Sequence, residues 1–139
     1  MKSLLLLLLL LPGCVLNAVA ANELHLSSTA VTAPDNASLS LVVETDEPIV
    51  AIRLTYISSL MFRQIQEVGS VLGSERGGTI QFEIHPPISG YKHIANLIWV
   101  TGELGTQHVS LLGAQGRRED GTWMSLAPAF ATVNVQGLE

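Results

Sequence analysis

The sequence predicts an all-β protein, an antiparallel β-sandwich of jelly-roll or immunoglobulin-like type with about 7–9 short strands. Three observations support this fold class. Apolar and polar residues alternate in short runs, which is the period of a half-buried strand. Turn-forming Gly, Pro, Asp and Asn recur about every 8–12 residues between these runs. The chain also lacks an amphipathic helical pattern of about ten residues or more.

The first twenty residues are expected to be a secretory signal peptide, with residues 21–139 forming one domain. Lys2 supplies a positive start, and residues 4–11 are an unbroken leucine run that is too short to span a bilayer. Residues 18–20, Ala-Val-Ala, match a small-residue cleavage site. The sequence therefore predicts a secreted or periplasmic protein.

A bacterial lipoprotein signal is the alternative to this cleavage. Residues 11–14, Leu-Pro-Gly-Cys, have the form of a lipobox, although proline is a poor residue at its second position. In that case a lipid on Cys14 would anchor the domain to the membrane. The cleavage site after Ala20 is favoured because its motif is intact, and the only cysteine would then leave with the signal.

Charge narrows the classes of partner. Without the signal, six basic residues stand against twelve acidic ones. Nucleic acids and anionic lipid surfaces require clustered Lys and Arg, so neither is expected as a partner. A domain of about 119 residues buries roughly two thirds of its extended-chain surface and needs no disulfide to fold.

The central stretch is residues 48–73. Its first part alternates as a strand, in which Arg53 and Thr55 face water and the inward side carries Val50, Ile52, Leu54 and Tyr56. A break follows at Ser58-Ser59. After it we expect either a short strand or one helical turn, closed at Gly69 and Gly73 where a positive φ costs little.

The remaining elements follow from the same two signals, alternation and turn residues. Further strands are expected at residues 24–33, 38–43, 80–84, 93–101, 109–111, 123–126 and 130–135. Turns or loops are expected between them at residues 33–36, 45–48, 73–78, 85–90, 102–105 and 113–121. The strand at 93–101 is apolar on both sides, which places Trp99 in the core.

The order of these features resembles a cohesin domain. The resemblance covers about residues 24–135 and depends on a strand ending in an aromatic residue, a leucine-led piece ending in glycine, and a glycine turn before a valine-rich strand. The matching residues are Tyr56, Leu60, Val68-Gly69, Gly105-Thr106, Asp120-Gly121 and Val133 to Val135. Ile57-Ser58 departs from the Asp-Pro that is usual in cohesins.

The resemblance implies a non-catalytic module that binds an extracellular protein, such as a dockerin-bearing one, on an open sheet face. The alternative is a carbohydrate-binding module, for which Trp123 and Tyr91 are the candidate aromatic pair. Arg117 and Arg118 in the polar loop are candidate partner contacts. No catalytic residue, cofactor or metal is expected.

Other polar residues have plainer interpretations than a reactive site. The four histidines lack the close spacing of metal ligands and are expected at strand edges or turns: His25, His85, His93 and His108. Glu44, Asp46 and Glu47 lack a calcium-loop motif and are expected to form a solvated turn. Nothing in the sequence brings Glu83 and Glu103 together as the acid and base of a glycosidase.

Overall fold

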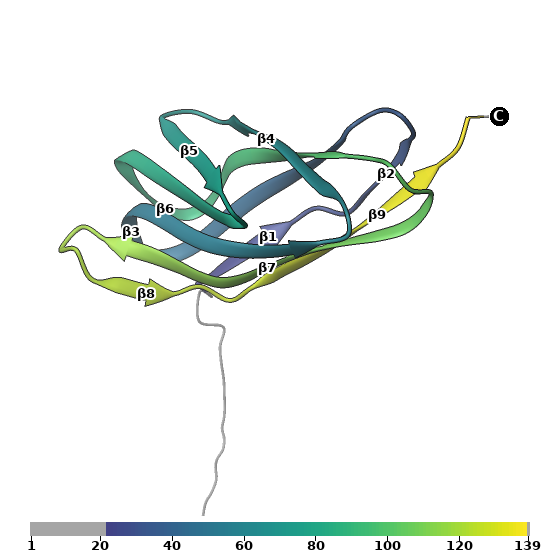
Figure 1. Cartoon of the computed structure of the whole chain (residues 1–139). Helices are drawn as coiled ribbons and strands as arrows, with labels where there is room; N and C mark the ends of the chain where they lie inside the picture. Colours follow the sequence, from purple (N-terminus) through teal and green to yellow (C-terminus); the bar gives the residue numbers. More distant parts are fainter. Residues whose placement is uncertain (1–21, 139) are drawn as a thin grey trace, which may run out of the picture.

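A computed structural model describes residues 22–138, which form nine strands and, within that range, no helix (Figure 1). The prediction of an all-β sandwich is confirmed. The predicted signal peptide, its cleavage site and Cys14 lie outside the described residues. The strands are β1 (Glu23–Leu26), β2 (Thr29–Thr32), β3 (Ala37–Ser58), β4 (Met61–Glu67), β5 (Val71–Arg76), β6 (Thr79–Val100), β7 (Gly105–Arg118), β8 (Trp123–Ser125) and β9 (Ala129–Gln136).

The fold is organised by β3 and β6, which pair antiparallel along nearly their whole length. The first half of β3 and the second half of β6 lie between β1 and β4. The other halves lie between β5 and β7, and the sheet continues from β7 to β9 and β2, with β8 also on β7. Both long strands bend between their halves, as Figure 1 shows, and each contributes to two layers.

The two layers bury one shared core. Leu41 in the first half of β3 and Leu54 in its second half are both fully buried and belong to the same apolar cluster. Arg53 and Thr55 are exposed on either side of Leu54, so the alternation predicted for residues 52–56 is confirmed. The prediction was wrong at the start of the stretch, because a register shift between Ile49 and Ala51 buries Ile49 and leaves Val50, which was expected inside, lining a surface pocket. Trp99 is fully buried, as expected. The sheet must fold over itself, because its inner residues would otherwise face water.

Several predicted turns are in fact strand. Residues 45–48 and 85–90 bend the two long strands without ending them, and residues 73–76 and 113–118 belong to β5 and β7. The prolines at 86 and 87 fall in a register shift where residues 84–87 have no partner on β3, so their missing N–H groups break no β3–β6 hydrogen bond. The loop predictions at residues 73–76 and 113–118 were wrong because polar residues there line a solvated sheet face, and those at 45–48 and 85–90 were wrong because proline and glycine mark bends within a continuing strand.

The N-terminal strand differs from the prediction as well. Residues 24–33 form two short strands, of which β1 pairs with β3 and β2 pairs with β9. The β2–β9 pair is parallel, unlike the others. Of the two alternatives for the piece after Ser58-Ser59, the structure has the short strand, β4.

Glycines have two different structural roles around β5, one in a turn and one in packing. Gly77 and Gly78, with φ of 59° and 90°, make a two-residue hairpin between β5 and β6. Gly73 was expected to close a turn but lies inside β5, where a Cβ would come within 2.9 Å of the Phe82 ring. Gly73 is therefore needed for close packing.

Candidate functional site

The candidate site is the solvent side of the layer that contains β5, β8 and the adjoining parts of β6, β3 and β7. We call it the outer face. Alternation in each strand sets which residues lie there, since their neighbours point into the core. The residues are Leu72, Ser74 and Arg76 on β5, Thr79, Gln81 and Glu83 on β6, Ala51, Arg53 and Thr55 on β3, Gln115 and Arg117 on β7, and Trp123 and Ser125 on β8.

One row of residues crosses all five strands of the outer face. In register order it is Leu72, Glu83, Ala51, Arg117 and Trp123. Leu72 is 74% exposed and Trp123 is 37% exposed. The row thus has an apolar side chain at each end and a charged pair between them.

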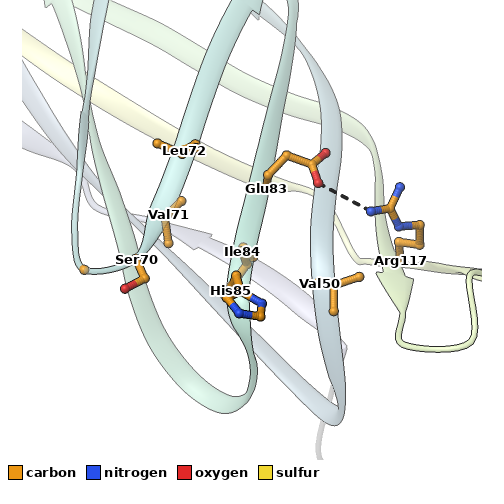
Figure 2. A pocket seen from close by; sticks show the side chains of 9 residues that line it. Val50, Ser70, Val71, Leu72, Glu83, Ile84, His85 and Arg117 are labelled. Atoms are coloured by element: carbon orange, nitrogen blue, oxygen red, sulfur yellow. Dashed lines mark hydrogen bonds and ion pairs between the residues drawn. The ribbon is translucent and has the colours of Figure 1, made fainter.

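The charged pair bridges β3. Arg117 Nη2 donates to Glu83 Oε1 at 3.4 Å, and both residues are register partners of Ala51 (Figure 2). Ala51 is only 2% exposed although it faces outward. Its small side chain leaves room for the ion pair above the strand. An exposed pair of this kind contributes about 0–1 kcal/mol to stability.

Two arginines lie over the indole of Trp123. The guanidinium carbons of Arg53 and Arg117 lie 4.8 Å and 5.7 Å from the centre of the ring. Cations at such distances are attracted to the ring face, and the contact orders the long arginine side chains. Trp123, Arg53 and Arg117 therefore form one cationic aromatic cluster.

The outer face is hollowed in two places. A pocket of about 460 Å³ is lined by apolar Leu72 and Val50 and by polar Glu83, His85 and Arg117 (Figure 2). A second, polar hollow lies around Arg53, Arg76 and Gln81, among others. A concave surface with few, fixed polar groups is the usual form of a recognition site.

Exposed apolar side chains extend the face along β3, β7 and β9. Ile57, Ser110 and Phe130 are register partners in a row. Ile57 is 67% exposed and Phe130 is 59% exposed. His108 stacks on Phe130 with 5.6 Å between ring centres. Exposed large apolar residues that share one face indicate an interaction surface.

The structure separates the four predicted binding residues. Arg117 and Trp123 lie together in the outer face. Arg118 instead bonds to Glu47 and, at 3.2 Å, to Thr122 Oγ1, where it holds the β7–β8 turn. Tyr91 is 64% exposed on the other layer, beside His25. Trp123 and Tyr91 thus do not form a shared aromatic platform for a sugar.

The other polar candidates are also placed apart. Glu83 is in the outer face, whereas Glu103 lies in the turn between β6 and β7 beside a different pocket. Of the acidic cluster, Glu44 lies beside His25 and Glu47 pairs with Arg118, whereas the backbone N–H of Asp46 donates to Asn22 Oδ1 at 2.9 Å. His93 contacts Asn96 Oδ1 at 2.9 Å.

Tyr56 has a shifted pKa beneath the outer face. Its hydroxyl donates to Glu75 Oε2 at 2.6 Å, and its ring makes an edge contact with Trp99 at 5.2 Å. Burial and the adjacent Glu75 carboxylate raise the pKa of Tyr56 to about 12. The phenol is therefore a neutral hydrogen-bond donor at ordinary pH, and this contact ties β3 to β5.

Sequence reasoning missed much of the outer face. Leu72 was assigned to the end of a helical turn or strand next to a loop, and β5 was not recognised. Arg53 was predicted to face solvent, but the sequence pattern did not show that its guanidinium lies over Trp123, because the two residues are seventy positions apart. Residues 71–76 show no clear alternation of apolar and polar side chains, and the available signal for β5 was the Gly77-Gly78 pair, which is typical of a two-residue hairpin.

Comparisons with known proteins identify the fold. No protein-family model matches the sequence, and no curated protein matches it. Several solved structures, in contrast, match the fold of this chain. A cohesin module from a Clostridium perfringens family 33 glycoside hydrolase superimposes with a TM-score of 0.71 at 12% identity, covering 86% of this chain and 100% of that one. A non-cellulosomal cohesin from Archaeoglobus fulgidus gives 0.66 at 17% identity, covering 84% and 91%.

A third structure is a type I cohesin from Clostridium thermocellum, solved in complex with a dockerin. Its TM-score is 0.66 at 8% identity, and the match covers 83% of this chain and 99% of that one. These likenesses show that the domain has a cohesin-like fold, which confirms the resemblance found in the sequence. Residues 22–138 include no helix with the length and apolar character needed to cross a membrane.

Proposed function

We propose that this protein is an exported, non-catalytic module that binds another extracellular protein on its outer face. The cohesin-like fold supports a binding role, since cohesins of this fold have been solved in complex with dockerins. A dockerin-type module is accordingly the partner class to test first. Fold alone does not assign function, so the proposal depends on the surface itself.

The observation that carries the proposal is the row from Leu72 to Trp123. It combines an exposed aliphatic side chain, an aromatic ring and an arginine, and tryptophan and arginine are enriched among residues that dominate binding energy. Glu83 and the ring of Trp123 hold Arg117 in place before any partner arrives. Such preorganisation lowers the entropy cost of association.

The charge of the outer face indicates the chemistry of the partner. Three arginines lie on it, Arg53, Arg76 and Arg117, although the whole chain has a formal net charge of −5. A complementary surface would place carboxylates near these guanidinium groups and apolar side chains near Leu72 and Ile57. We therefore expect a partner segment with mixed acidic and apolar character.

The test uses the protein as bait for proteins secreted by its source organism, followed by affinity measurement with the captured partner. Leu72→Lys adds a charge at a site that is 74% exposed, so folding should be retained while affinity falls at least about tenfold. The matched control is Tyr91→Lys, which changes a residue 64% exposed on the other layer. Loss of affinity in the control with none in Leu72→Lys would refute the proposed face.

Export is part of the proposal and has its own test. Mass spectrometry of the mature N-terminus should find a start at Ala21, which follows the predicted cleavage site. A start at a lipid-modified Cys14 would instead establish the anchored form. An intact Met1 would contradict export through either signal.

A further inference from the structure

Three potential metal ligands converge on the layer opposite the outer face. Glu23 and His25 are two residues apart on β1 and lie on the same side of the strand. Glu44 on β3 is the direct register partner of Glu23. One ligand atom from each of the three residues lies within 4.8 Å of the others.

The contacts among these residues leave the two carboxylates incompletely compensated. His25 Nε2 is 3.1 Å from Glu23 Oε2 and 3.1 Å from Glu44 Oε1. A single nitrogen carries at most one proton, so it makes one full hydrogen bond and not two. Like charges placed directly across two strands are destabilising. A divalent cation between the three groups would compensate both carboxylates and use the imidazole lone pair.

The imidazole lies beside an aromatic ring and the cluster is open to solvent. The ring of Tyr91, on β6 across β3 from β1, lies 5.3 Å from the His25 ring in a tilted contact. The side chains of His25, Glu23 and Glu44 are 36%, 31% and 32% exposed. An ion can therefore enter from solvent, and water can complete its coordination.

We propose that Glu23, His25 and Glu44 form a binding site for a divalent cation of the zinc type. One imidazole nitrogen with two carboxylate oxygens suits Zn²⁺, which accepts three protein ligands and a water, whereas Ca²⁺ and Mg²⁺ prefer oxygen ligands only. The bound ion would join β1 to β3 and thereby fasten the first strand of the domain. The site is separate from the outer face, so the proposal stands independently of the proposed function.

Calorimetric titration of the metal-free protein with ZnCl₂ tests the site. We expect one Zn²⁺ per chain, with an affinity that falls at least about tenfold in His25→Gln and in Glu44→Gln, since each variant removes one of three ligands. The control is His108→Gln, which removes a histidine that stacks on Phe130 in the other layer and should bind Zn²⁺ as the wild type does. Zn²⁺ should also raise the Tm of the wild type and of the control by similar amounts, and the Tm of each ligand variant by less, because their affinity is weaker.

Three results would overturn the assignment. Equal Zn²⁺ affinity in His25→Gln and the wild type would show that the imidazole is not a ligand. Loss of binding in His108→Gln would place the ion elsewhere. Ca²⁺ competing as effectively as Zn²⁺ at equal concentration would show that the carboxylates bind alone, without the proposed nitrogen ligand.

Discussion

Gly73→Ala probes the packing beneath the edge strand of the outer face. Gly73 lies in β5 between Leu72 and Ser74, which face outward, so its own side faces the core. A Cβ at this position would lie 2.9 Å from Phe82 Cε1, 3.0 Å from Phe82 Cδ1 and 3.1 Å from Ile65 Cδ1. Phe82 is fully buried, which leaves its ring little room to move.

The expected change in the free energy of unfolding is the sum of two opposing effects. Overpacking a core by one methyl group costs about 1–3 kcal/mol. Replacing glycine by alanine also reduces the entropy of the unfolded chain, which stabilises by about 0.4–1 kcal/mol. We expect Gly73→Ala to destabilise the domain by about 1–2 kcal/mol, which lowers the Tm by roughly 4–8 °C.

Gly102→Ala is the matched control for this change. A Cβ at Gly102 would have no heavy atom within 4 Å, and its φ is not in the left-handed region. Only the entropy term then applies, and the control should gain about 0.4–1 kcal/mol. Chemical denaturation of both variants gives the difference in free energy of unfolding. Equal stabilities, within about 0.5 kcal/mol, would refute the close packing of β5 on Phe82.

Three further predictions concern the core, a titration and the ion pair. Leu54→Ala should lower the free energy of unfolding by about 2–5 kcal/mol, because Leu54 is fully buried, whereas Thr55→Ala, which removes an exposed hydroxyl that donates to Leu112 O, should lower it by about 1 kcal/mol or less in the same urea titration. Because the pKa of Tyr56 is raised to about 12 in the folded state, its contribution to stability should be complete below pH 10 and lost between pH 10 and 12, a loss that Tyr56→Phe should not show. Glu83→Gln should cost less than about 1 kcal/mol, because its ion pair with Arg117 is exposed.

Each of these predictions has an outcome that would contradict it. Equal effects of the changes at positions 54 and 55 would mean that the strand does not alternate between core and solvent. A pH profile for Tyr56→Phe that matches the wild type from pH 10 to 12 would place the titration on another group. A cost of several kcal/mol for Glu83→Gln would show that this carboxylate is more than a surface partner.

The sequence predicted the sandwich well because alternation is a direct consequence of having one buried face. It placed Ile52 and Leu54 inside, and Trp99 in the core, since each lies in an apolar pattern with the correct period. The prediction of strand ends failed where a strand passes from one layer to the other. The pairs Thr45–Gly90 and Ile49–Ile88 show β3 and β6 bending together, and proline and glycine at such bends were interpreted as strand ends.

The candidate site was harder to predict because its parts come from five strands. Arg117 was selected from a predicted polar loop and Trp123 from the start of the strand predicted after it, and register then joined them to Glu83 and Leu72 on distant segments. Ala51 shows most clearly which part of the site cannot be predicted from the sequence. A small outward residue in a strand has no sequence signal of its own, and its role follows only from the ion pair that crosses above it.

Hydrogen exchange of the protein, alone and with its captured partner, tests the central claim most directly. We predict added protection of backbone amides in β5, in residues 79–84 of β6 and in residues 115–117 of β7, which carry the outer face. Amides of β1 and those near Tyr91 should exchange at unchanged rates. Protection confined to β1, β4 and the second half of β6 would contradict the account.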